Sequence, residues 1–224
     1  GSFGYAGFFS FEMTKPVNTF GGGMVVSRDG GLIDFIKSRT ADDIEDSGPV
    51  AGKIRATLTE QRLFSTGLSF PFLYALATPS FRPIMERIYR RSFHAPPRNL
   101  RYLASQARMG MAGLRTLPAR LLVRAERARL LRSLLSPKVV SQRVSAECFP
   151  THYFFVVQLP CDPCAIRKRL LVRGIDAGIG GEIADDCAAL LGFGDCPNVG
   201  HVYAHALALP MWDDISVASL ERVA

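Results

Sequence analysis

A lysine between two apolar runs is the feature that most constrains how this chain can fold. An aromatic run at residues 7–11 leads into a short polar stretch with Lys15, and three glycines at 21–23 lead into an apolar, β-branched run at 24–26. Short apolar runs separated by polar residues and glycines are typical of two strands joined by a loop. The sequence therefore predicts a strand, a loop and a second strand, with Lys15 at the apex of the loop.

The predicted loop offers a primary amine and a hydroxyl. A lysine shielded from water is more often neutral, and a neutral amine can attack a carbonyl to form a Schiff base. Ser10 lies at the end of the first strand, where its hydroxyl and the neighbouring N–H can donate to a phosphate, and the glycines allow a ligand close to the backbone. These features suit pyridoxal phosphate. Taken by themselves, however, such features more often belong to a solvated surface lysine and a tight connection.

The residues around Lys15 also resemble a known motif. Ser-Phe-x-x-Thr-Lys at 10–15, a later glycine pair with Met-Val-Val, and Gly-Ser-Phe-Gly at 1–4 look like the cofactor-lysine segment of the DegT/StrS family of sugar aminotransferases. The resemblance implies that Lys15 forms the Schiff base with pyridoxal 5'-phosphate and that Ser10 contacts the cofactor phosphate. It also implies a homodimer that moves an amino group from an amino acid, with glutamate as the expected donor, to a keto-sugar nucleotide in surface-glycan or related sugar biosynthesis.

Two features distinguish this chain from a complete member of that family. The family usually has an acidic residue before its glycine pair, where this chain has Gly21. The resemblance also begins in the middle of a domain, which predicts that the 224 residues are a C-terminal fragment without the upstream aspartate that binds the pyridine nitrogen. Because a cofactor without that carboxylate is a weaker electron sink, the fragment alone is expected not to catalyse transamination.

The expected fold class is α/β, as the C-terminal portion of a fold-type-I PLP-dependent transferase. With 48% of its residues apolar, the chain can bury a core. Residues 1–50 are expected to end the large cofactor-binding domain, and residues 51–104 to form a helical, hydrophobic and basic insertion. A connecting helix, broken near Pro118, is expected at 105–136, and a small α/β domain at 137–224.

The connecting helix carries a second candidate contact to the cofactor. Residues 105–109 resemble the family's Asn-x-Arg-Met segment, with Gln106 in the place of the asparagine. In the family, that asparagine reaches the cofactor phosphate of the other subunit. Gln106 is therefore a predicted cofactor-binding residue across a dimer interface. The alternative is that Gln106 and Arg108 face solvent.

The last third of the chain has its own pattern of strands and helices. Residues 152–159 form an apolar run typical of a strand. A helix is predicted to begin at Pro163 and to stop at Gly174, since proline favours the first helical position and glycine the end. Further helices are expected to open at Pro197 and near Ser216, which is a suitable N-cap residue.

The middle of the chain is apolar and basic. Residues 63–81 carry no charge, but they include two prolines and a glycine, and arginines flank both ends, which argues against a membrane span. This segment either packs on the protein or its dimer partner, or lies in a membrane leaflet. Residues 82–132 account for the whole basic excess of the chain; aromatic stacking platforms are sparse in this range, and it contains no recognised nucleic-acid-binding motif. Anionic lipid along residues 63–132, or a nucleotide-sugar diphosphate, fits this charge better than nucleic acid.

No metal site is predicted. Cys161 and Cys164 form a CxxC without a second pair, and His201 and His205 lack a third ligand or an accompanying glutamate. Five cysteines, an odd number, and the lack of a signal peptide favour the cytoplasm, with peripheral membrane contact as an open alternative. The rival interpretation of function is a non-catalytic, membrane-associated binding protein on an aminotransferase-like scaffold.

Overall fold

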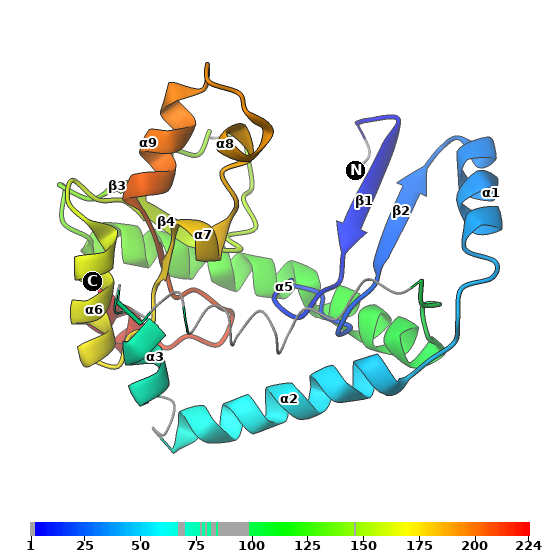
Figure 1. Ribbon diagram of the computed structural model, residues 1–224, viewed down its shortest axis with the longest axis horizontal. Coiled ribbons are helices and arrows are strands. Elements are labelled where there is room, and N and C mark those ends of the chain that lie inside the picture. Colours follow the sequence, from blue (N-terminus) through cyan, green and yellow to red (C-terminus); the bar gives the residue numbers. More distant parts are fainter. Residues whose placement is uncertain are drawn as a thin grey trace. The chain divides into compact units, whose positions relative to one another are not determined.

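Two compact units make up the chain in this computed structural model. The first unit comprises residues 1–67 and 92–118, and the second comprises residues 68–91 and 119–224. Figure 1 shows the helices and strands of both units. The structure describes the following residues: 3–66, 70–76, 78, 80–81, 84, 99–145 and 147–224.

A two-stranded antiparallel sheet carries the lysine loop in the first unit. Strands β1 (Ala6–Ser10) and β2 (Gly23–Ser27) pair over their whole length, with Ser10 opposite Gly23 at the loop end. The apolar runs on both sides form the strands, and the polar stretch between them forms the loop. The strand, loop and strand predicted around Lys15 are therefore confirmed.

Helices lie next to this sheet in sequence and in space. The helices that the structure describes in the first unit are α1 (Gly30–Arg39), α2 (Gly48–Ser65) and the first half of α5 (Ala104–Leu134). Helix α1 begins after Asp29, whose carboxylate accepts a hydrogen bond of 3.2 Å from the Leu32 N–H. A parallel bridge between Ile44 and Leu100 connects the segments that precede α2 and α5. This bridge joins parts of the first unit that are far apart in the sequence.

Helix α5 is continuous where the sequence predicted a break. Pro118 lies inside the helix, so the predicted break near this residue is wrong. A proline removes one backbone donor and crowds the carbonyl four residues earlier. The residues on both sides of Pro118 are mostly leucine, alanine and arginine, which favour the helix and let it continue through the proline. The boundary between the two units follows Pro118, so the first half of α5 belongs to one unit and the second half to the other.

The second unit contains an antiparallel sheet with the strand order β3-β4-β6-β5. Its strands are β3 (Val140–Ser141), β4 (Phe155–Gln158), β5 (Gly178–Ile179) and β6 (Ala206–Leu209). The helices described in this unit, besides the second half of α5, are α3 (Phe70–Leu76), α6 (Pro163–Val172), α7 (Gly180–Ile183), α8 (Cys187–Leu191), α9 (Pro197–His205) and α10 (Val217–Val223). Strand β6 is buried along its whole length. The largest fully buried apolar side chains of this core are Leu131, Val157, Leu207, Ile215 and Leu220.

Local sequence signals set the helix ends in the second unit. Helix α6 begins after Asp162, which caps it, and Pro163 takes the first helical position. Gly174 follows the end of α6 with a φ of 77°, which glycine adopts readily. The Ser216 hydroxyl caps α10 by accepting from the N–H of Ser219 at 3.1 Å. The predicted helix starts at Pro163 and Ser216 are thus confirmed.

The strand predicted at residues 152–159 is shorter in the structure. Strand β4 begins only at Phe155, because His152 has a φ of 46° and a left-handed residue cannot continue an extended strand. The Arg124 guanidinium donates from Nη1 to the carbonyl oxygen of His152 at 3.4 Å. A long-range contact therefore accompanies the unusual backbone at His152.

A carboxylate and two arginines join α5 to the segment before α10. Arg120 and Arg124 each donate from Nε to the carboxylate of Asp213. Burial raises the pKa of Asp213, but hydrogen bonds from Arg124 and Arg120 outweigh burial and hold this pKa below its ordinary value.

The pKa of His152 is also lowered. Burial of the imidazole is the main cause, and the positive charges of Arg132 and Arg124 add to it.

We expect the second unit to lose stability in two steps as the pH falls. Because the folded pKa of His152 is lowered, the unfolded chain binds this proton more tightly, and stability falls below about pH 6.5. The contribution of Asp213 is present above about pH 3.8 and is lost as the pH falls through its lowered pKa. Urea unfolding at a series of pH values measures both steps. His152→Asn, which keeps a residue tolerant of positive φ, should remove the first step, and a first step that persists in this variant would contradict the assignment.

Two expectations about the middle of the chain stay predictions. Within the described ranges, no helix combines the length and the apolar composition needed to cross a bilayer. The uncharged segment 63–81 lies only partly within these ranges, so neither interpretation of it is decided. The insertion expected at 51–104 includes most of α2 as well as residues outside the described ranges, and the four-part division of the chain is likewise untested.

Candidate active site

Backbone hydrogen bonds close the loop between β1 and β2 around Lys15. The carbonyl oxygen of Phe11 accepts from the N–H groups of Thr19 at 3.0 Å and Gly21 at 3.3 Å. Within the loop, the Lys15 N–H donates to the carbonyl oxygen of Glu12 at 2.9 Å, which closes a four-residue turn with Lys15 as its last residue. The Lys15 side chain is partly buried. The backbone that carries Lys15 is therefore fixed by contacts within the first unit.

Glycine is required where the loop enters β2. Gly22 has a φ of 83°, and a Cβ atom on this residue would lie 2.5 Å from the ring of Tyr102. A Cβ on Gly23 would lie 2.7 Å from the carbonyl oxygen of Phe9. The sequence predicted that the glycines allow a ligand close to the backbone, and the structure shows that Tyr102 takes the space beside Gly22. These glycines thus permit close packing of the loop against the chain itself.

Gln106 binds the far end of the same loop. Its side chain is buried, and Nε2 donates to the carbonyl oxygens of Thr19 at 3.0 Å and Gly21 at 3.2 Å. Its Oε1 accepts from the N–H of Leu103 at 3.0 Å, just before α5 begins, as in one half of a capping box. The alternative that Gln106 faces solvent is therefore wrong. Its predicted contact with a cofactor phosphate of another subunit stays a prediction.

Thr19 and Tyr102 also belong to the site, and sequence reasoning missed both. Thr19 is fully buried, and its hydroxyl lies 2.7 Å from the carbonyl oxygen of Gly21 and 3.1 Å from the Tyr102 hydroxyl. The two residues are 83 positions apart, so no local pattern indicates their contact. Together with Gln106 they attach the loop to the start of α5.

Helix α2 holds the near end of the loop. Lys53 Nζ lies 2.7 and 2.9 Å from the two carboxylate oxygens of Glu12. One turn later on α2, the Thr57 hydroxyl lies 3.6 Å from the sulfur of Met13. Glu12 and Met13 are the first two residues of the turn that ends at Lys15. The loop is thus held on one side by α2 and on the other by α5.

Ser10 and Lys15 lie on the same loop. Ser10 is the last residue of β1, is exposed, and accepts from the Glu12 N–H at 3.4 Å. The donor set of a primary amine and a nearby hydroxyl fits a cofactor that has an aldehyde for the amine and a phosphate for the hydroxyl. The structure therefore brings Ser10 and Lys15 to one loop, and Gln106 on α5 binds the far end of that loop.

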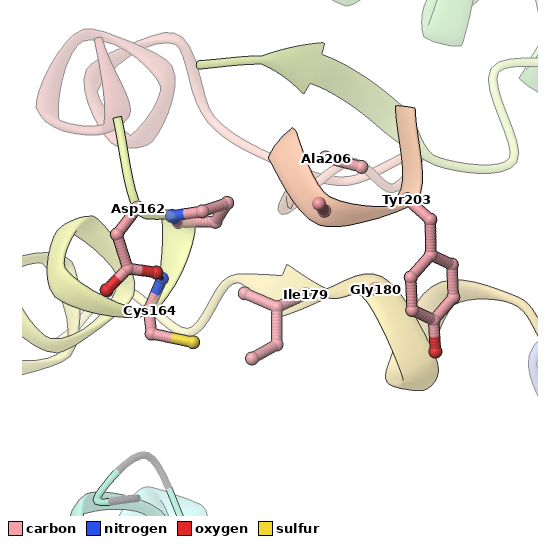
Figure 2. A pocket seen from close by; sticks show the side chains of 8 residues that line it. Asp162, Cys164, Ile179, Gly180, Tyr203 and Ala206 are labelled. Atoms are coloured by element: carbon pink, nitrogen blue, oxygen red, sulfur yellow. Dashed lines mark hydrogen bonds between the residues drawn. The ribbon is translucent and has the colours of Figure 1, made fainter. Parts of the chain in front are cut away.

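The second unit contains a small pocket of its own. It has a volume of about 180 Å³ and lies between α6, β5 and α9, with the Cys164 thiol and the Tyr203 ring on its wall (Figure 2). The Asp162 carboxylate at its edge accepts from the N–H of Cys164 at 2.9 Å, so this group already caps α6. None of Lys15, Ser10 and Gln106 lines the pocket. It therefore adds no group to the lysine loop.

The histidine pair on α9 and the CxxC cysteines are the residues in which the sequence suggested possible metal ligands. The rings of His201 and His205 lie 4.4 Å apart on α9, and His205 Nδ1 contacts the carbonyl oxygen of His201. In the part of the chain that the structure describes, no three His, Cys, Asp or Glu side chains come together as a metal site requires. No disulfide bond joins Cys161 to Cys164.

The chain is similar to known aminotransferases in both sequence and structure. The model of the DegT/DnrJ/EryC1/StrS aminotransferase family matches residues 1–224. No curated protein matches the chain. Among solved structures, the aminotransferase TlmJ from Streptoalloteichus hindustanus matches with a TM-score of 0.65 and 20% identity, over 100% of this chain and 51% of that chain.

Two further solved structures resemble the chain to a similar degree. A candidate sugar aminotransferase, Spr1654 from Streptococcus pneumoniae in its PLP form, matches with a TM-score of 0.61 and 15% identity, over 99% of this chain and 50% of that chain. DesI, solved in the presence of its TDP-sugar product, matches with a TM-score of 0.59 and 20% identity, over 98% of this chain and 48% of that chain. The likeness confirms the predicted fold class, and the chain spans about half the length of each of these structures.

Proposed function

Since the chain belongs to the DegT/DnrJ/EryC1/StrS aminotransferase family, we propose that the complete protein transfers an amino group to a keto-sugar nucleotide with pyridoxal 5'-phosphate as cofactor. The observation that carries this proposal is Lys15 on a loop that α2 and α5 hold by long-range hydrogen bonds. The PLP form of Spr1654 supports the cofactor, and the TDP-sugar of DesI supports the substrate class. Glutamate is the proposed amino donor, and surface-glycan or related sugar biosynthesis is the proposed setting.

Lys15 Nζ carries the chemistry in this proposal. The cofactor, when bound, supplies an electron sink for the charge left on a carbon atom that loses a proton. Lys15 Nζ would hold the cofactor through its aldehyde. The same amine would move the proton at the substrate carbon, accepting it as a general base and giving it up as a general acid. The Ser10 hydroxyl would donate a hydrogen bond to the phosphate.

The first role that we propose for Gln106 is to hold the lysine loop. Both hydrogens of its amide bind the carbonyl oxygens of Thr19 and Gly21, and its oxygen accepts from Leu103. A contact with a phosphate from another subunit requires Gln106 to exchange one of these bonds. We propose that Gln106 orients the backbone after Lys15, and that the complete protein is a homodimer in which this region lies near the second subunit.

Exposed aromatic residues on β1 and just before it support a larger complete protein. The fractional exposure of Phe3 is 104%, of Tyr5 71% and of Phe8 85%. Large apolar side chains grouped on a short hairpin are typical of a surface that other residues cover. We propose that further residues of the complete protein cover this hairpin and supply the carboxylate for the pyridine nitrogen. The 224-residue chain alone is then expected to be inactive.

Release of the keto acid tests this proposal. We expect the complete protein, incubated with pyridoxal phosphate and glutamate, to release about one 2-oxoglutarate per active site, because the amino group remains on the enzyme until an acceptor arrives. Residues 1–224 alone should show no turnover. A complete protein that releases no keto acid from any of the common amino acids would contradict the proposed reaction, and turnover by residues 1–224 would contradict the need for further residues.

A further inference from the structure

The ion pair between Glu12 and Lys53 connects the lysine loop to α2. The two residues are 41 positions apart, and Lys53 Nζ lies within 2.9 Å of both carboxylate oxygens of Glu12. The side chains of Lys53 and Glu12 are 40% and 45% exposed, so water screens the pair and its effect on global stability is small. Its effect is local, on the segment of the loop that contains Glu12.

That segment is the turn that carries Lys15. The carbonyl oxygen of Glu12 accepts the hydrogen bond from the Lys15 N–H at 2.9 Å, so Glu12 begins the turn and Lys15 ends it. Because the carboxylate and the carbonyl belong to the same residue, fixing the side chain of Glu12 also restricts the peptide that receives this hydrogen bond. The contact of Thr57 with Met13 restricts the next residue of the turn. Helix α2 therefore holds two consecutive residues ahead of Lys15.

Gly21 is a second observation that points to the same pair. The family motif that residues 10–26 resemble usually has an acidic residue at this position. In this structure, a Cβ atom on Gly21 would lie 3.4 Å from Lys53 Nζ and 3.8 Å from Glu12 Oε2. A side chain at this position would enter the space that the Glu12 carboxylate and Lys53 occupy. With a φ of 130°, Gly21 also has a backbone conformation that other residues rarely adopt. Gly21 therefore leaves this space to the Glu12 carboxylate and the Lys53 amine.

We propose that Lys53 is a positioning residue that, through Glu12, holds the Lys15 turn in the conformation in which the lysine reacts with a carbonyl group. This inference rests on the proposed function of Lys15. Reaction of an amine with a carbonyl requires the two atoms to approach within about 3 to 3.5 Å in a defined direction. Without the Lys53 cation, the Glu12 carboxylate is released from α2, and the turn samples orientations that do not react.

The test follows modification of Lys15 in the complete protein. Pyridoxal phosphate is the probe, borohydride fixes the product, and mass spectrometry gives the fraction of Lys15 modified with time. We expect Lys53→Met to slow this reaction about tenfold. Restoring the pair with reversed charges, by Glu12→Arg together with Lys53→Glu, should recover the rate to within about threefold of the native value. The matched control is Lys37→Met, because Lys37 forms an exposed pair with Asp34 on α1 and should not affect Lys15.

Each outcome supports or overturns the inference. Equal rates for the native protein and Lys53→Met overturn it and leave the proposed function intact. A charge-reversed pair that stays as slow as Lys53→Met also overturns it, because a purely structural role of Lys53 in α2 would give that result. If Lys53→Met does not fold, the charge-reversed variant is compared with the native protein alone. A rate of Lys15 modification within about threefold of the native value then supports the inference, and a lower rate overturns it. A native protein that is not modified at Lys15 overturns the proposed function first, and this inference with it.

Discussion

Lys15→Ala in the complete protein is expected to abolish the absorbance band of lysine-bound pyridoxal phosphate. The same variant should lower the rate of amino transfer about a thousandfold or more, because it removes both the proposed attachment point of the cofactor and the proposed general base. The cofactor should still bind noncovalently, since Lys15→Ala leaves Ser10 and the loop backbone in place. Absorbance spectra with added pyridoxal phosphate, followed by equilibrium dialysis, measure the band and the binding separately.

A matched control separates the loss of Lys15 from a general loss of lysines. Lys37 lies on the exposed side of α1, where it pairs only with Asp34 at 3.7 Å among the contacts that the structure gives for its side chain. Lys37→Ala should therefore keep both the band and the rate. A Lys15→Ala protein that keeps a band which borohydride fixes covalently would show that another amine holds the cofactor.

Gly22→Ala is expected to destabilise the first unit by about 2 to 4 kcal/mol. A left-handed backbone costs a residue with a side chain roughly 1 kcal/mol or more, and overpacking costs about 1 to 3 kcal/mol in addition. Both costs apply here, because Gly22 has a φ of 83° and its Cβ would lie 2.5 Å from the Tyr102 ring. Urea unfolding followed by a probe in the first unit measures the change.

Gly52→Ala is the control for the glycine prediction. Gly52 lies inside α2, and a Cβ there would have no atom within 4 Å. Alanine has a higher helix propensity than glycine, so this variant should be more stable by roughly 0.5 to 1 kcal/mol. If Gly22→Ala unfolded at the same urea concentration as the native chain, the close packing of the loop against Tyr102 would be contradicted.

The parts of the fold that the sequence predicted depend on local signals. The hairpin follows from two short apolar runs on either side of a polar loop, and the starts of α6 and α10 follow from Pro163 and Ser216. The backbone of a cap or a turn is set by residues only a few positions apart. A single sequence contains that information, which is why these elements were predictable.

The errors occur where the preference of a single residue is overridden. Proline alone favours a break, but Pro118 lies within a continuous helix whose neighbouring leucine, alanine and arginine residues favour that helix. His152 leaves the strand conformation, with Arg124 bound to its carbonyl oxygen from a helix 28 positions away. The contact of His152 has no signal in its neighbouring residues.

In the candidate site, too, the residues close together in the sequence could be predicted and the long-range contacts could not. Lys15 and Ser10 were predicted from a compact motif, because both lie within six consecutive residues of the chain. The groups that hold their loop come from 41 to 87 positions away, at Lys53, Tyr102 and Gln106. Only Gln106 was singled out from the sequence, and its bonds to Thr19 and Gly21 were not predicted. Long-range support of a loop is a property of the folded chain and leaves no periodic pattern.

Mass mapping of the lysine that reacts with the cofactor tests the central claim most directly. The complete protein is treated with pyridoxal phosphate and then with borohydride, and the modified peptide is identified. The account predicts that the modification lies on Lys15 at close to one per chain. A modification spread over other lysines, or absent from Lys15, would contradict it and reduce the motif to a structural hairpin.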